Sequence, residues 1–235
     1  MLPFLLRRSD VSKPPKTNWR PGLALFTYAI TFSLAYVTLD AGIGALLLFG
    51  AVQVTMLAAG LLRGERWSKT QGFGLLVAMA GFVLLVSPGL SAADPPDPIG
   101  ATLMAVSGVA WGVYSLYGRG VSAPTRATAR NFLLATPLVL VTAGVMWSDA
   151  SFTTNGVVLA LCSGVLTSGF GYVIWYAALR GHSATSAAIV QLAVPVIAAL
   201  GGILLLSEEL SIRFMVASVL TLGGVAAAIL GARRS

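Results

Sequence analysis

Long stretches without a charged side chain constrain this chain more than any other feature. Eight such windows hold 18 to 30 residues each, and the charged residues gather in the short segments between them. About 20 helical residues cross a bilayer core of about 30 Å, and a backbone amide without a partner in hydrocarbon costs several kcal/mol. The windows are residues 21–39, 41–62, 70–93, 98–118, 131–148, 150–179, 183–207 and 214–232. The sequence therefore predicts an all-α membrane protein with about eight transmembrane helices. The apolar runs are continuous, which excludes a membrane β-barrel because its strands alternate apolar and polar residues.

The distribution of basic residues predicts how the helices are threaded. A net charge of +7 would suggest a nucleic-acid partner in a soluble protein, but only 10% of these residues are charged. Eight crossings place both terminal segments and every second loop on the same side of the membrane. This side holds 14 of the 15 Lys and Arg residues, and Arg213 lies on the other side. Lys and Arg in short loops mark the cytoplasmic side. We therefore expect a multi-pass protein of the cell inner membrane with both termini in the cytoplasm, and no nucleic-acid partner.

An internal similarity at a constant spacing of 143 residues divides the chain into two halves. The sequence Glu-x-x-Ser begins at Glu65 and again at Glu208, and Gly81 corresponds to Gly224. The charge pattern places Glu65 on the cytoplasmic side and Glu208 outside, so the halves are predicted to run in opposite directions as inverted repeats.

Inversion requires an odd number of helices in each repeat. Residues 1–87 hold three windows and form a partial first repeat, whereas residues 98–235 hold five and form a complete second repeat. A Pro-rich segment, residues 88–97, is the predicted external linker. Two helices are expected before residue 21 and are missing. A start codon assigned too far downstream is favoured over a genuine eight-helix form.

Diffuse motifs in both halves resemble those of a known transporter family. The first half has an aromatic helix ending at Tyr36, an apolar helix ending in Gly-Glu65-Arg, and a Gly-rich helix through Gly81. In the second half the corresponding features are Trp111 with Arg119, an aromatic helix through Tyr176, Pro195, and Glu208. Over residues 21–231 the chain resembles EamA-type transporters of the drug/metabolite transporter (DMT) superfamily. It departs from their pattern by lacking the first two helices, and by having Val52 where the repeat would place the proline matched by Pro195.

The resemblance implies a secondary transporter that exports a small metabolite, amino acid or drug-like solute by alternating access. An inactive fragment or a non-transporting membrane subunit remains the alternative, because two helices are missing. An intramembrane enzyme would need buried acids, paired histidines or a Ser–base pair, and none can be assembled, so we expect no enzymatic activity, cofactor or metal. The expected partners are a small-molecule substrate and the lipid bilayer, and a homodimer is left open.

Because no Asp, Glu, Lys, Arg or His lies deep in a window, substrate recognition is predicted to rest on uncharged polar and aromatic side chains. Pro195 has no amide hydrogen and leaves the carbonyl of Gln191 without its helical donor, which creates a polar spot near mid-membrane. Gln53, at a similar depth in the first half, is expected to face Gln191 across a central cavity. The predicted substrate-binding residues are Gln53, Trp111, Tyr114, Tyr172, Trp175, Gln191 and Pro195. Pro195 and Gln191 also have a purely structural interpretation as a packing kink.

Two carboxylates mark the ends of predicted helices. Glu65 and Glu208 each precede a helix in corresponding positions of the two halves. A carboxylate at a helix start is stabilised by the positive end of the helix dipole, which is a structural role. The alternative is that the two residues act in gating.

Overall fold

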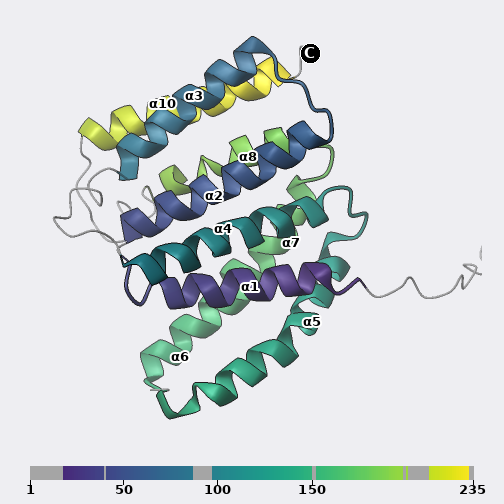
Figure 1. Ribbon diagram of the computed structural model, residues 1–235, viewed down its shortest axis with the longest axis vertical. Coiled ribbons are helices and arrows are strands. Elements are labelled where there is room, and N and C mark those ends of the chain that lie inside the picture. The colour runs from purple at the N-terminus through teal and green to yellow at the C-terminus, as the bar shows by residue number, and fades with distance from the viewer. Residues whose placement is uncertain are drawn as a thin grey trace, which may run out of the picture.

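The computed structural model describes residues 18–39, 41–86, 97–149, 152–197, 200 and 212–232, and within these ranges the regular structure is helical (Figure 1). Its elements are α1 (Arg20–Ala35), α2 (Ala41–Leu62), α3 (Lys69–Val86), α4 (Pro98–Gly118), α5 (Pro124–Val145), the short 3₁₀ helix η2 (Trp147–Asp149), α6 (Thr154–Leu161), η3 (Cys162–Phe170), α7 (Gly171–Ala178), α8 (Ala184–Gln191) and α10 (Ile212–Ala232). The all-α prediction is confirmed over these residues. Residues 88–96 of the predicted linker, and Glu208, lie outside them.

Five of the described helical segments are long and apolar enough to cross a membrane. They are Ile43–Leu62, Pro98–Gly118, Pro124–Val145, Thr154–Ala178 and Ile212–Ala232. Lys69–Leu85 and Ala184–Ile197 are apolar but shorter. The number of eight crossings therefore stays a prediction.

Prolines and a carboxylate set where several helices begin. The first turns of α1, α4 and α5 each contain a proline, where the missing amide hydrogen leaves no helical bond unmade. Asp97 caps α4 by accepting a hydrogen bond from the Gly100 amide at 2.7 Å, and it also accepts one from the Thr38 hydroxyl at 3.0 Å. This carboxylate therefore joins the end of α1 to the start of α4. Helix α5 begins at Pro124, earlier than the apolar window predicts, because that proline starts the helix within the basic segment.

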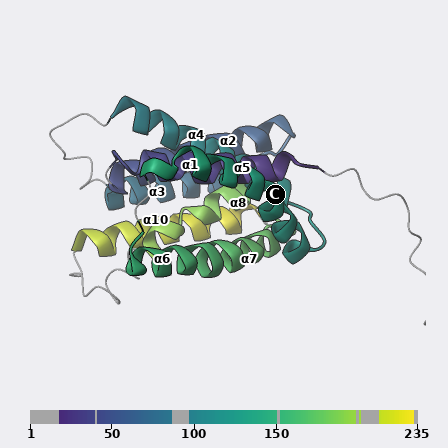
Figure 2. The same cartoon turned by 90° about the horizontal axis from the view of Figure 1, so that it is seen from below.

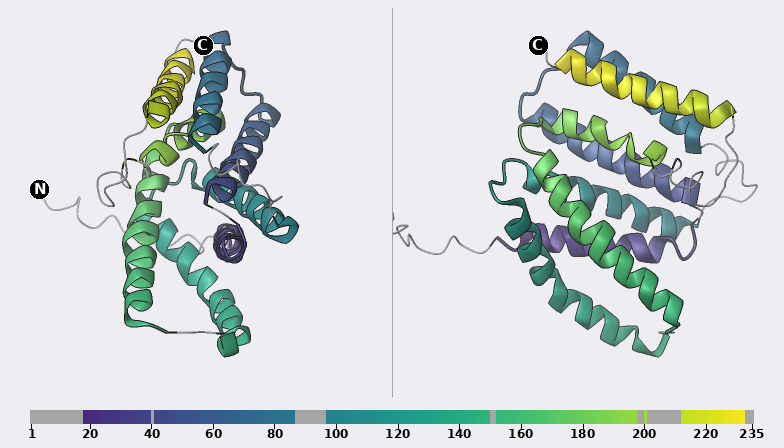
Figure 3. Two further views of the ribbon diagram at one scale, coloured as in Figure 1. Left: turned by 90° about the vertical axis from the view of Figure 1, so that its left-hand side faces the viewer. Right: turned by 180° about the vertical axis from the view of Figure 1, so that it is seen from behind.

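The helices lie in two layers. One layer holds α4, α2 and α1, and the other holds α10, α8 and the continuous rod of α6, η3 and α7 (Figure 2). Helix α4 packs between α1 and α2, α8 packs on α2, and α5 packs on α1 and α7. Helices α3 and α10 lie side by side at one edge, as both views in Figure 3 show.

Small residues make the contact between α3 and α10. A Cβ atom added at Gly224 would lie 2.6 Å from the carbonyl oxygen of Gly74, and one added at Gly81 would lie 2.8 Å from that of Ala217. The two contacts are equivalent under the repeat spacing of 143 residues. This spacing relates Gly81 to Gly224 and Gly74 to Ala217, so each contact joins the counterparts of the residues in the other. Small residues, and above all glycine, allow two helix backbones to approach so closely.

Burial differs sharply between two long helical segments. Helix α1 contributes five buried residues, among them Leu25 and Ala35, to the interior. Helix α6 and η3 contribute none. Most of the segment Thr154–Phe170 is therefore exposed to the surroundings of the bundle.

Candidate substrate-binding site

A cavity of about 290 Å³ lies between helices from both parts of the chain. It is lined by Tyr28, Leu48, Phe49, Trp111, Thr167, Gly171, Tyr172, Trp175, Gln191 and Val194. Pockets that hold small ligands measure about 300–1,000 Å³, so this cavity suits one small molecule. None of these ten side chains is charged at neutral pH. Four of the predicted substrate-binding residues, Trp111, Tyr172, Trp175 and Gln191, line it.

Three aromatic rings from three helices form the centre of the lining. The ring centroid of Trp111 on α4 lies 4.8 Å from that of Tyr28 on α1 and 5.0 Å from that of Tyr172 on α7. Tyr28 and Tyr172 are 6.5 Å apart. Tyr114 lies behind this group, 5.6 Å from Trp111, and is fully buried, so it supports the rings and does not line the cavity.

Internal hydrogen bonds hold the two tryptophans and Gln191 in place. Trp111 donates its indole N–H to the amide oxygen of Gln191 at 2.5 Å, and Trp175 donates to the Ser115 hydroxyl at 2.9 Å. The amide nitrogen of Gln191 donates to the sulfur of Met56 at 3.1 Å. The indole N–H groups are thus engaged within the protein, and the rings offer the cavity their carbon surfaces.

Helix α8 breaks beside the cavity. It ends at Gln191, four residues before Pro195. The next two amides bond to carbonyls three residues earlier, Leu192 to Ile189 and Ala193 to Val190, both at 3.1 Å. This tightening releases the carbonyl of Ala188 from its ordinary helical donor, the Leu192 amide.

Gln53 supplies the donor that the break removes. Its amide nitrogen donates to the carbonyl oxygen of Ala188 at 2.6 Å, and its side chain is only 3% exposed. Gln53 therefore does not line the cavity opposite Gln191. The reason lies in the repeat spacing, because the residue 143 positions before Gln191 is Leu48, which does line the cavity. Helix α2 continues without a break through Val52, in contrast to α8 before Pro195.

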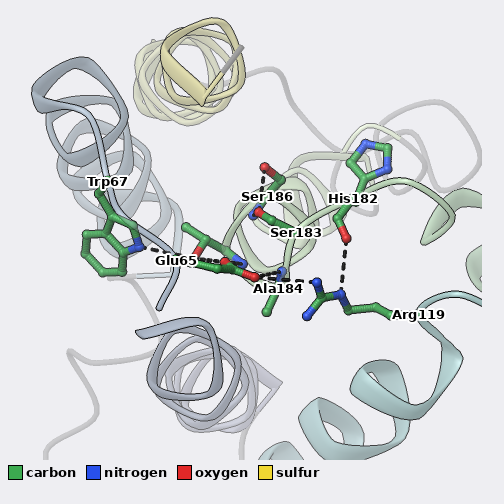
Figure 4. Close-up of polar contacts among 8 residues, drawn as sticks. Glu65, Trp67, Arg119, His182, Ser183, Ala184 and Ser186 are labelled. Carbon is green, nitrogen blue, oxygen red and sulfur yellow. Dashed lines mark hydrogen bonds and ion pairs between the residues drawn. The ribbon is translucent and has the colours of Figure 1, made fainter. Parts of the chain in front are cut away.

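Glu65 caps a helix of the other half of the chain. Its carboxylate accepts hydrogen bonds from the Ala184 amide at 2.8 Å, the Thr185 amide at 3.0 Å and the Thr185 hydroxyl at 2.7 Å, as Figure 4 shows for part of this network. These donors belong to the first turn of α8, whereas the helix that follows Glu65, α3, is capped by the Ser68 hydroxyl, which accepts from the Gln71 amide at 3.1 Å. The expectation that Glu65 serves the start of its own following helix is therefore replaced by a cap between segments.

Further contacts join the same end of the bundle. Arg119, which follows α4, forms an ion pair with Glu65 at 3.5 Å and donates to the carbonyl of His182 at 3.1 Å. Trp67 donates its indole N–H to the Thr185 hydroxyl at 3.1 Å. Partial burial by itself raises the pKa of Glu65, but the hydrogen bonds from Thr185 and Ala184 and the charge of Arg119 outweigh it. The pKa of the carboxyl is therefore below its ordinary value, so Glu65 is ionised at neutral pH and ties three segments together.

Several residues that line the cavity were not predicted as site residues from the sequence. Leu48, Phe49, Thr167 and Val194 are apolar or weakly polar and resemble ordinary membrane-facing positions. The 143-residue spacing could have identified some of the cavity-lining residues. It pairs Tyr28 with Gly171 and Leu48 with Gln191, and all four line the cavity.

A π-helical segment brings Thr167 to the cavity. The predicted window at 150–179 is one continuous helix, Thr154–Ala178, but its centre, Cys162–Phe170, has π-helical geometry. The wider turn changes which side chains share a face, and π-helical segments often occur at functional sites. Apolar periodicity cannot reveal such a turn, because in this segment nearly every position is apolar or small.

Comparisons with known proteins agree with this architecture. Residues 98–230, more than half of the chain, match the EamA-like transporter family. The chain is 49% identical over 227 residues to the uncharacterized protein PA1977 of Pseudomonas aeruginosa, covering 96% of this chain and 78% of that protein. It is 27% identical over 236 residues to an uncharacterized transporter of Archaeoglobus fulgidus, covering 96% and 81%.

A solved crystal structure shares the fold. Its TM-score is 0.72 at 22% sequence identity, and the match covers 92% of this chain and 77% of the other. The family match and the apolar helical spans define a multi-pass membrane transporter. The chain belongs to the EamA-like transporter family, of the DMT type.

Proposed function

We propose that this chain is a secondary transporter that carries a small solute through the aromatic cavity by alternating access. The observation that carries the proposal is the cavity itself, which is lined by side chains of α1, α2, α4, η3, α7 and α8 and contains no charged group. Trp111, Tyr172, Trp175 and Gln191 are proposed to contact the solute. Tyr114, Gln53 and Pro195 are proposed to support them, by packing, by capping the broken helix and by causing the break.

The two halves, residues 1–87 and 98–235, are proposed to be inverted repeats, the first with two helices fewer. The reciprocal α3–α10 contacts support this, as do the two cavity pairs at the same spacing, Tyr28 with Gly171 and Leu48 with Gln191. The Glu65 network is proposed to be the gate that is closed in this conformation, because it joins α8 to α4 and to the segment after α2. Glu208 is proposed to have the matching role at the opposite end.

An inner-membrane location with both termini in the cytoplasm completes the proposal and rests on the distribution of basic residues. Export as the direction of transport rests on the family resemblance alone. Cysteine labelling tests the orientation in intact cells. In a Cys162→Ala background, Ser122→Cys is expected to resist a membrane-impermeant maleimide and Phe152→Cys to react. The reverse labelling pattern would contradict the threading.

Transport itself is tested by counterflow in proteoliposomes. A thermal-shift panel of amino acids, polyamines, nucleosides and cationic dyes selects a solute, whose labelled form is then offered to vesicles preloaded with the unlabelled solute. We expect transient accumulation with the wild type and with Trp147→Ala, whose exposed side chain lies away from the cavity, and none with Gln191→Leu or empty vesicles. Folded wild-type protein that supports no counterflow of any selected solute would refute the proposal.

A second candidate, a membrane subunit completed by another polypeptide, is favoured by one observation. Helix α6 and η3 have no buried residue, whereas α1, which corresponds to η3 and α7 at the repeat spacing, packs against two helices. In a homodimer or a larger complex this face would be covered. The single cysteine, Cys162, lies exposed on it, so oxidative cross-linking in membranes, with Cys162→Ser as the control, distinguishes a covered face from a lipid-facing one.

A further inference from the structure

Most of the hydrogen-bond donors that line the cavity are already used within the protein. The two indole N–H groups go to Gln191 and Ser115, and the Gln191 amide goes to Met56. The hydroxyl of Thr167 donates to the carbonyl of Ser163 at 2.7 Å. The hydroxyls of Tyr28 and Tyr172 lie beside each other. A ligand entering this cavity therefore finds few free donors.

A cavity of this kind disfavours anions. Carboxylates and phosphates are held by Arg or Lys side chains, or by several N–H groups that converge on them. The ten lining residues include no Arg, Lys or His. A solute with a carboxylate or phosphate would lose hydrogen bonds to water on entering the cavity, and protein donors would not replace them.

The same lining favours cations. The faces of Trp, Tyr and Phe rings carry negative potential and attract a cation within about 6 Å of the ring centroid. Tyr28, Trp111 and Tyr172 are mutually close, with centroids 4.8–6.5 Å apart, and Trp175 and Phe49 add further rings. The amide oxygen of Gln191 accepts one bond, from Trp111, and has a second lone pair. The cavity therefore offers π surfaces and acceptor oxygens.

The ligand must also lose water at low cost. A small, strongly hydrated ammonium ion would not recover its hydration energy in a site without a carboxylate. A cation whose charge is spread out or shielded by carbon loses much less. We propose that the cavity binds a monovalent organic cation with apolar substituents, such as a quaternary ammonium ion bearing an aromatic group. This inference rests on the proposed function, in that it names the substrate class of the same transport site.

Calorimetric titration of the detergent-purified full chain tests the inference. The cationic probe is benzyltrimethylammonium, and phenylacetate is the anionic comparison. Choline and its uncharged carbon isostere 3,3-dimethylbutanol form a second pair that isolates the effect of charge. We expect benzyltrimethylammonium to bind more tightly than phenylacetate, and choline more tightly than dimethylbutanol. The inference is overturned if phenylacetate binds more tightly, or if the isosteric pair bind equally.

Substitutions at Tyr172 locate the binding and test the role of the ring. Tyr172→Leu removes the π surface and is expected to weaken benzyltrimethylammonium binding about 3- to 30-fold, whereas Tyr172→Phe, which keeps the ring, stays within about twofold of the wild type. Trp147→Leu is the control for loss of an exposed ring elsewhere. Equal affinities for Tyr172→Leu and the wild type, with both proteins folded by thermal melting, would also overturn the inference.

Counterflow separates this inference from the proposal on which it rests. If labelled phenylacetate or a neutral solute is carried and no cation is, the transporter proposal stands and the cation preference is wrong. If benzyltrimethylammonium binds with the expected Tyr172 dependence and neither it nor any other solute is carried, the cation site stands and the transport proposal is wrong.

Discussion

Two of the regions in which the residues before 88 meet those after 97 are built in opposite ways. Between α3 and α10, Gly74, Gly81 and Gly224 bring two helix backbones into direct contact. Around the cavity, large rings from α1, α4 and α7 hold the helices apart and leave about 290 Å³ between them. In a bilayer, lipid tails are as apolar as Leu, so close van der Waals packing and hydrogen bonds must hold helices together. The first region relies mainly on packing, with a hydrogen bond from the Ser68 hydroxyl to the Gly231 carbonyl at 3.0 Å, and the second combines rings with several specific hydrogen bonds.

This difference indicates which changes each region tolerates. The α3–α10 contact depends on shape, so an added methyl group is harmful whatever its polarity. The cavity region depends on particular donors and acceptors, such as the Trp111–Gln191 and Gln53–Ala188 bonds, so loss of one bond matters more to binding than to folding. Substitutions in the two regions can test the contrast.

The largest effect on stability is expected from Gly224→Ala. Its new methyl group would overlap the backbone of Ala78 and Gly74, which cannot move without separating α3 from α10. We expect a loss of about 3 kcal/mol in the free energy of unfolding, measured by denaturant titration in detergent micelles. Gly223→Ala is the matched control, because a Cβ at Gly223 meets nothing within 4 Å. That variant should be neutral or slightly stabilised, since Ala favours a helix over Gly. Similar losses for both variants would remove the contrast.

Glu65→Ala is expected to have the next largest effect, about 1–3 kcal/mol, because it leaves the amides of Ala184 and Thr185 without their acceptor and Arg119 without its ion-pair partner. Glu65→Gln, which keeps one acceptor oxygen, should lose less.

The same residue predicts a pH dependence. Because the pKa of Glu65 is lower in the folded protein than its ordinary value, its stabilisation is complete above the unfolded-state pKa and is lost as the pH falls through the folded-state pKa. Between about pH 6 and about pH 3.5, the melting temperature of the wild type should fall further than that of Glu65→Gln. Other carboxyls, such as Asp97, titrate in both proteins and cancel in the comparison. Parallel melting curves of the two proteins over this pH range would show that the Glu65 contacts do not depend on its charge.

A smaller effect is expected from Trp175→Phe, which keeps an aromatic ring at the cavity but removes the N–H donor to Ser115. Hydrogen bonds between membrane helices contribute about 0.5–1 kcal/mol on average, so the free energy of unfolding should fall by that amount. For Trp147→Phe, at an exposed position, the free energy of unfolding should fall by less. A loss as large as that of Gly224→Ala would mean that the cavity wall is as intolerant as the α3–α10 contact.

The smallest effect is expected outside both regions, from Leu166→Ala on η3. This side chain is 56% exposed, so its truncation removes little packing against other helices. Unfolding in micelles should therefore change by less than about 0.5 kcal/mol. The same variant should also leave unchanged the cross-linked products that form through Cys162 in native membranes. A change in that cross-linking would instead support a partner at this face.

The amino-acid sequence alone predicted the all-α membrane fold, the approximate helix positions and four of the ten cavity residues. It could do so because the requirement of the bilayer is local. A charge-free run of about 20 residues in hydrocarbon must form its own backbone hydrogen bonds, whatever surrounds it. Aromatic and amide side chains inside such runs are few, and Trp111, Tyr172, Trp175 and Gln191 are conspicuous among them.

The tertiary structure decided the partners. Glu65 caps α8 instead of α3, Gln53 bonds to Ala188 instead of facing Gln191, and Thr167 reaches the cavity through a π-helical turn. Each of these outcomes depends on which residues of distant segments meet, on where a helix breaks and on how widely it turns. Those properties belong to the packing of several helices at once, so no single apolar window contains them.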